Sequence, residues 1–290
     1  MEGAYGCVTR DSGRISKAFQ KADDLKEEYD VHQKLHLQDI KNYTHFYITN
    51  PEKHRLNQPV MCKGASVLDV LQYEDGGEPL SAFAKNMDSK AVFLGMANIF
   101  QGVKRMNRKK RYHLDIKPAN IVIDPAGVFR LIDFGFSKNL EHVQALPEVQ
   151  NPHFNESYEY WPIEMMLLER LNSLKDKVDF DQVYPYIRGY TAVLKDDLPV
   201  LRMNKIQLET QDITGRLGYT DIYDKCDVWG LGITLCYLYE IFKTTALLPL
   251  IQKLLTFNPL QRPSATEACK AYLNFLYQNY PETQVMTPLR

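Results

Sequence analysis

Apolar and polar residues at the start of the chain follow two different periods. Residues 6–10 (GCVTR) and 14–19 (RISKAF) read as short strands, and the triplet DSG between them is typical of a turn. Residues 23–38 (DDLKEEYDVHQKLHLQ) instead place mostly apolar side chains three or four positions apart. The first forty residues therefore predict a hairpin followed by an amphipathic helix.

The pattern changes again after the predicted helix. Residues 40–75 read as β-structure, because the runs HFYIT, QPVMCKG and SVLDVLQY are separated by Asn, Pro and Gly. Residues 91–106 have their apolar positions on one helical face, and most of the remainder is also helical in character. We expect an α+β chain with two lobes and a cleft between them: a small β-rich N-lobe over residues 1–75 and a larger helical C-lobe over residues 76–290.

Composition and charge exclude some classes of function. The 290 residues are 44% hydrophobic, which is enough for a sizeable core, and the net charge of −1 gives no overall attraction to nucleic acid or anionic membranes. The most apolar stretch, residues 228–242, is too short to span a bilayer. The basic run at 104–111 could serve nuclear targeting, but it fits better the solvated end of a helix, where cations suit the negative end of the helix dipole. We expect an intracellular protein, cytoplasmic rather than nuclear.

The cysteines support the same compartment. The five of them are scattered, odd in number and without CxxC spacing. This pattern predicts free thiols in a reducing environment, rather than a disulfide framework or a zinc site.

Two neighbouring stretches, HLDIKPANIVID (113–124) and FRLIDFG (129–135), carry the candidate chemistry. Phosphoryl transfer requires an oriented acceptor, cations to stabilise the phosphoryl oxygens, and hard oxygen ligands for Mg²⁺. Asp115 could orient or deprotonate an acceptor hydroxyl, and Lys117 could stabilise the transferring group. Asn120 and Asp133 offer oxygen ligands suited to Mg²⁺.

These stretches resemble the catalytic loop and the metal-binding loop of eukaryotic-type protein kinases. The Lys two positions after Asp115 resembles the serine/threonine members of that family. The resemblance implies a divergent serine/threonine protein kinase, with some similarity to the kinases of large DNA viruses. It implies transfer of the γ-phosphate of ATP, with Mg²⁺, to Ser or Thr of a protein substrate.

The resemblance extends to nucleotide-binding residues in the N-lobe. EGAYGCV (2–8) resembles the Gly-rich loop, with Gly3 and Gly6 as its later glycines and Val8 following them; Met1 stands where the first glycine would be. The lobe is therefore expected to be truncated at its start. Lys17 fits the strand lysine that contacts the phosphates, with Lys21 as the alternative. Glu28 fits the helix glutamate that pairs with this lysine, with Glu27 as the alternative.

The segment LQYEDGGEPL (71–80) resembles the hinge between the lobes of a kinase. The resemblance makes Leu71 the residue behind the adenine pocket. It assigns adenine contacts to the backbone of Gln72 and Glu74, and a position near the ribose to Glu78.

Three C-lobe residues, Glu164, Asp227 and Arg262, also match the order of scaffold residues in the kinase family. Asp227 is expected to brace the catalytic loop, and Arg262 to pair with Glu164. Leu114 stands where many kinases carry an Arg that binds a phosphorylated activation loop, which predicts activity without that phosphorylation. The interval 165–226 is longer than usual and is predicted to be an atypical insertion.

Two other functions fit the same residues. A pseudokinase would bind nucleotide as a scaffold without turnover, and a small-molecule kinase would phosphorylate a metabolite.

Overall fold

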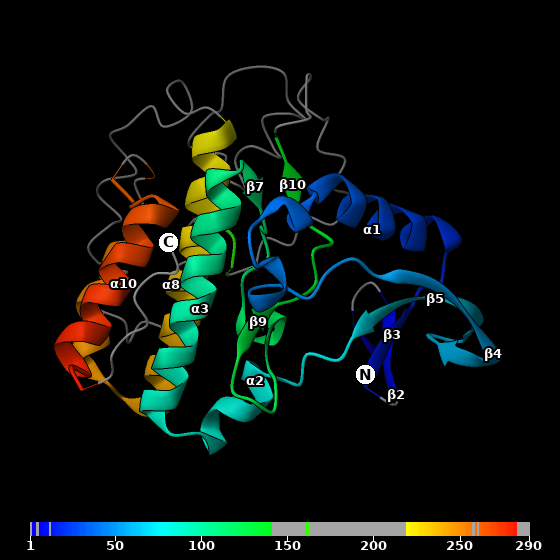
Figure 1. Ribbon diagram of the computed structural model, residues 1–290, viewed down its shortest axis with the longest axis horizontal. Helices are drawn as coiled ribbons and strands as arrows, with labels where there is room; N and C mark the ends of the chain where they lie inside the picture. The colour runs from blue at the N-terminus through cyan, green and yellow to red at the C-terminus, as the bar shows by residue number, and fades with distance from the viewer. Residues whose placement is uncertain are drawn as a thin grey trace, which may run out of the picture.

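The computed structural model describes residues 2–3, 6–11, 13–140, 160–162, 219–256, 259 and 261–282. Strands dominate its first part and helices its later part, as the sequence predicts (Figure 1). The strands are β1 Glu2–Gly3, β2 Gly6–Asp11, β3 Arg14–Ala18, β4 Glu52–Cys62, β5 Ala65–Glu74, β6 Glu78–Pro79, β7 Arg111–Tyr112, β8 Ile121–Ile123, β9 Phe129–Leu131 and β10 Lys138–Asn139. The α-helices are α1 Ala22–Leu35, α2 Leu80–Phe83, α3 Ser89–Arg108, α8 Tyr219–Phe242, α9 Leu248–Leu254 and α10 Ala265–Asn279. Short 3₁₀ turns are η1 Leu37–Asp39, η2 Tyr43–His45, η3 Ala84–Asn86, η4 Pro118–Asn120 and η5 Thr245–Leu247.

The N-terminal sheet has the strand order β1-β2-β3-β5-β4, with antiparallel neighbours throughout. The predicted hairpin is β2–β3, in which Val8 is aligned with Lys17. Lys17 is in turn aligned with Leu71 of β5. This register places all of β3 beside the second half of β5, the half that leads into the C-terminal part.

One predicted strand is absent from the sheet. HFYIT forms the end of η2 and a single bridge, Tyr47 to Leu131, because its apolar side chains pack inward. The Tyr47 hydroxyl donates to Gly102 O at 2.6 Å, and Ile48 N donates to Leu131 O at 2.9 Å. The segment therefore serves as a buried connection to α3 and β9.

The prediction that all five cysteines are free thiols is wrong for two of them. Cys7 and Cys62 form a disulfide that closes a sequence separation of 55 residues. The two cysteines lie on strands that are not neighbours in the sheet, β2 and β4, but both pack in one small apolar cluster with Ala18. Cys226, Cys236 and Cys269 are free and buried, as expected. The cysteines consequently no longer argue for a reducing compartment.

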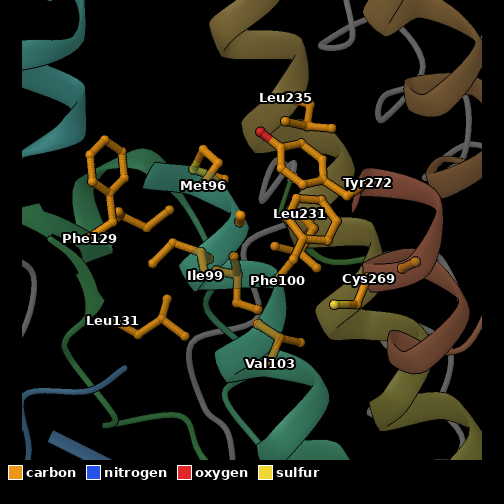
Figure 2. Close-up of a cluster of buried hydrophobic side chains, with 14 of the residues drawn as sticks. Met96, Ile99, Phe100, Val103, Phe129, Leu131, Leu231, Leu235, Cys269 and Tyr272 are labelled. Atoms are coloured by element: carbon orange, nitrogen blue, oxygen red, sulfur yellow. The ribbon is translucent and has the colours of Figure 1, made fainter. Parts of the chain in front are cut away.

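The C-terminal core is built around α3, α8 and α10, which run side by side (Figure 1). Side chains from these helices meet those of β9 in one cluster, shown in Figure 2. The Phe100 and Tyr272 rings stack at 4.1 Å, and the Tyr272 hydroxyl donates to Phe93 O at 2.7 Å. Burial of this apolar area stabilises the helices against which β7 and β9 pack.

The predicted insertion at 165–226 lies largely outside the described residues, as does Glu164. Its last residues, 219–226, belong to α8, so the central helix begins earlier than the sequence suggested. Among the helices that are described, none combines the length and the apolar character needed to cross a membrane.

Candidate active site

Lys17 lies at the meeting point of two carboxylates. Its Nζ is 2.7 Å from Glu28 Oε2 on α1 and 3.1 Å from Asp133 Oδ1, which follows β9. The Lys17 and Glu28 side chains are only 15% and 7% exposed. Burial lowers the pKa of Lys17, but the Asp133 and Glu28 carboxylates raise it further, so the ammonium form is retained. The ion pair expected between Lys17 and Glu28 is therefore present, rather than one with Lys21 or Glu27.

The turn after β7 carries the second cluster. The Asp115 Oδ2 atom accepts hydrogen bonds from Lys117 Nζ at 2.9 Å and Asn120 Nδ2 at 2.8 Å. Asn120 Nδ2 also donates to Asp115 O at 2.9 Å, and the Asp115 side chain is 1% exposed. The three residues that the sequence singled out in this loop thus form one connected group, anchored by the η4 turn.

A histidine joins the two clusters. The His113 Nδ1 atom accepts from Asp115 N at 3.3 Å, so its Nε2 carries the hydrogen and donates to Ile132 O at 3.0 Å. Burial lowers the pKa of His113 to about 4, which keeps the ring neutral. Asn120 O accepts from Ile132 N at 3.0 Å. The catalytic-loop segment and the segment before Asp133 are therefore fixed to each other through the backbone.

Asp227 of α8 anchors the backbone of the loop that carries Asp115, as predicted. Its Oδ1 accepts from Leu114 N at 2.8 Å and its Oδ2 from His113 N at 3.1 Å. Leu114 has φ of 62° and Asp133 has φ of 61°, a region that non-glycine residues seldom adopt and that is enriched at functional sites. Gly230 lets α8 approach the backbone of the loop at Ile116, since a Cβ on residue 230 would lie 2.7 Å from Ile116 O.

Of the predicted hinge residues on β5, only Leu71 is aligned with Lys17. Leu71 is fully buried beside Lys17. Gln72 is aligned with Ser16 on one side and Glu52 on the other, so its backbone lies within the sheet and not at an open edge. Glu74 is aligned with Arg14 of β3. An adenine contact through Gln72 would have to compete with strand pairing.

The remaining predicted site residues are Glu78 and the glycines of the Gly-rich hairpin. The Arg10 guanidinium pairs with Glu78 and, at 2.8 Å, with Asp75, which connects β2 to the hinge. Gly3 is aligned with Gly6 across the β1–β2 pairing. The structure thus places this hairpin beside β3 in the same sheet, but it does not bring Glu78 together with Lys17 or Asp133 through any contact of the described residues.

Asn120 and Asp133 have the chemistry expected of Mg²⁺ ligands. Burial raises the pKa of Asp133, but the Lys17 ammonium, with smaller effects of His113 and Lys117, lowers it by more in total, so the carboxylate is anionic. The Asp133 side chain is 40% exposed, so it stays accessible. An ionised carboxylate and an amide oxygen are ligands that Mg²⁺ accepts when phosphate oxygens and water supply the others. The residues fit the ion.

Two residues near the site escaped the sequence analysis. Tyr73 of β5 reaches Glu28, and its neighbour His32 of α1 packs against the Phe134 ring at 5.6 Å. A tyrosine in a hinge and a histidine on a helix carry no motif, so only the fold reveals them.

Leu114, which stands where the resemblance to kinases would place an Arg, is buried among apolar side chains. It packs in a cluster with Trp161 and Tyr223, and Trp161 Nε1 donates to Leu114 O at 2.6 Å. The Trp161 ring also meets Phe136 at 5.7 Å.

Arg262 is 1% exposed and donates to Lys225 O at 3.0 Å and Thr256 O at 2.8 Å. Its predicted partner, Glu164, lies outside the described residues.

A β-sheet lobe that carries a Lys–Glu pair, joined through Asp133 to a helical lobe that carries the Asp115 loop, defines the protein kinase class of fold. Residues 8–180 match the protein kinase domain family, which is more than half of the chain. The chain therefore belongs to that family.

Named relatives agree with this assignment. The chain is 30% identical over 150 residues to cyclin-dependent kinase-like 2 of Oryctolagus cuniculus, which covers 48% of this chain and 25% of the relative. It is 28% identical over 167 residues to serine/threonine-protein kinase TOUSLED of Arabidopsis thaliana, covering 55% and 23%. It is 24% identical over 226 residues to cGMP-dependent protein kinase 2 of Rattus norvegicus, covering 71% and 29%. The matches thus span about a quarter of each relative.

Proposed function

We propose that this protein transfers the γ-phosphoryl group of ATP to serine or threonine hydroxyls of protein substrates. The observation that carries the proposal is Lys17 Nζ lying within 3.1 Å of both Glu28 and Asp133, which links the two lobes at the expected nucleotide site. The serine/threonine assignment is supported by Lys117 and by the name of the TOUSLED relative.

The roles of the residues follow from their charges. Lys17, held by Glu28, binds phosphate oxygens of ATP, and Asp133 with Asn120 would hold Mg²⁺. When bound, Mg²⁺ neutralises charge on the phosphates. Asp115 orients the acceptor hydroxyl and takes its proton, the new O–P bond forms, the bond from the γ-phosphorus to the bridging oxygen breaks, and ADP leaves. Lys117, 2.9 Å from Asp115, stabilises the transferring oxygens.

One observation favours the alternative, a nucleotide-binding scaffold without turnover. The Asp115 side chain is 1% exposed, and one of its carboxylate oxygens already accepts two hydrogen bonds. A general base must lie within hydrogen-bond reach of the acceptor proton. Transfer therefore requires that an acceptor hydroxyl reach the Asp115 carboxylate.

A labelling assay separates the candidates. The full chain is incubated with Mg²⁺ and γ-labelled ATP and a generic protein acceptor, beside Asp115→Asn and Asp133→Asn, and ATP binding is measured by calorimetry. Label on Ser or Thr with wild type, and its loss in both variants, supports the proposal. Nucleotide binding without any transfer establishes the scaffold instead, and label found only on a metabolite establishes a small-molecule kinase.

A further inference from the structure

A chain of polar groups runs behind the Lys17–Glu28 pair. The Tyr73 hydroxyl on β5 lies 2.7 Å from Glu28 Oε1 and 3.2 Å from His32 Nε2. His32 Nδ1 lies 2.7 Å from the Thr49 hydroxyl. The chain thus crosses three segments that are distant in sequence and ends on the carboxylate that holds Lys17.

The direction of these hydrogen bonds can be assigned. An ionised Glu28 can only accept, so the single Tyr73 proton is directed to it, the stronger of the two available bonds. The Tyr73 oxygen then accepts from His32 Nε2–H. His32 Nδ1 is left as an acceptor and takes the Thr49 proton. Every donor in the chain therefore points toward Glu28.

These hydrogen bonds end on the Glu28 carboxylate, and its position determines where Lys17 is held. Glu28 Oε1 accepts from both Lys17 Nζ, at 2.9 Å, and Tyr73. Burial raises the pKa of Glu28. A hydroxyl donor favours the ionised form and acts against this effect. Because Tyr73 belongs to the sheet and Glu28 to α1, the bond also fixes the helix relative to the strand that carries the hinge.

We propose that Tyr73 is a positioning residue for the nucleotide site: its hydroxyl holds the Glu28 carboxylate against Lys17, and His32 and Thr49 hold that hydroxyl in place. This inference rests on the proposed function, because it assigns a device to the same site. It predicts that Lys17 is oriented for phosphate before nucleotide binds.

Tyr73→Phe removes the hydroxyl and keeps the ring. We expect kcat/KM for ATP to fall about 10-fold through a higher KM for ATP, the magnitude of one lost hydrogen bond to a charged group, with KM for the protein acceptor unchanged. A purely structural role would reduce the active fraction and leave KM for ATP unaltered. In a Glu28→Gln background, the same change should have less than about a 2-fold effect, since the charged acceptor is gone. Tyr277→Phe, at a tyrosine that is 72% exposed, is the matched control.

A second readout does not need turnover. Acetic anhydride modifies lysine amines, and we expect it to modify Lys17 of the nucleotide-free protein several-fold faster in Tyr73→Phe. Without the Tyr73 hydroxyl, Glu28 is no longer held against Lys17 and stabilises its unreactive ammonium form less. Thr49→Val, which removes the far donor, should shift both readouts in the same direction by less. If wild type shows no transfer, the proposed function fails but Lys17 labelling still tests Tyr73. Unchanged KM for ATP and unchanged Lys17 labelling in a folded Tyr73→Phe or Thr49→Val variant would overturn the inference.

Discussion

His32 is buried in its neutral form, and this makes the stability of the fold sensitive to acid. The ring is 1% exposed, and burial, with a smaller effect of the Lys17 ammonium, lowers its pKa from 6.5 to about 3. In the unfolded chain the same ring takes up a proton near its ordinary pKa. A base whose pKa is lowered on folding contributes stability above the unfolded value and loses it as pH falls toward the folded value. The relevant window is therefore pH 6.5 down to about 3.

The magnitude follows from the width of that window. Between pH 7.5 and 5.0 the unfolded chain gains close to one proton at this site over about 1.5 pH units, which corresponds to about 2 kcal/mol. His32→Gln keeps an acceptor and a donor but cannot titrate. We expect wild type to lose about 2 kcal/mol more free energy of unfolding over this pH change than the variant does.

Urea unfolding at the two pH values provides the test. Buried acids such as Asp227, whose pKa burial raises to about 7, act in the opposite direction, but they are common to both proteins and cancel in the comparison. His54→Gln, at an exposed histidine on β4, is the control and should match wild type at both pH values. Parallel pH profiles for wild type and His32→Gln would refute the argument.

Three further changes test other parts of the structure. Cys7→Ser opens the disulfide and should lower the free energy of unfolding by up to about 4 kcal/mol for a closed loop of 55 residues, as should a reducing agent added to wild type; equal urea midpoints would show that the cross-link contributes nothing. Lys117→Met removes the ammonium beside Asp115 and should lower kcat by about 100-fold with little change in ATP affinity, which steady-state kinetics and calorimetry measure; an unaltered kcat would exclude Lys117 from transfer. Trp161→Phe leaves the buried Leu114 carbonyl without its indole donor and should cost about 1 kcal/mol in urea unfolding, while no loss would mean that another donor replaces it.

The sequence predicted those parts of the site that depend on short spacing. Asp115, Lys117 and Asn120 fall within one turn, so their order along the chain almost determines their contacts. Lys17 and Glu28 are predictable because a strand followed at once by a helix leaves few places for the helix to pack. The α+β organisation followed from the change of period near residue 75.

Other features depend on long-range packing and gave no local signal. The Tyr73 hydroxyl reaches Glu28 only because β5 lies next to β3. The disulfide joins two strands that are not neighbours, so the scattered spacing of the cysteines misled the prediction. HFYIT has the composition of a strand, but burial against α3 and β9 overrides that propensity.

A crystal structure of the full chain with Mg²⁺ and a non-hydrolysable ATP analogue tests the central claim most directly. The account predicts a metal at about 2.1 Å from oxygens of Asp133 and Asn120, with Lys17 Nζ on a phosphate oxygen and still paired with Glu28. Nucleotide bound elsewhere, or phosphates placed away from Lys17 with no metal at Asp133, would contradict it.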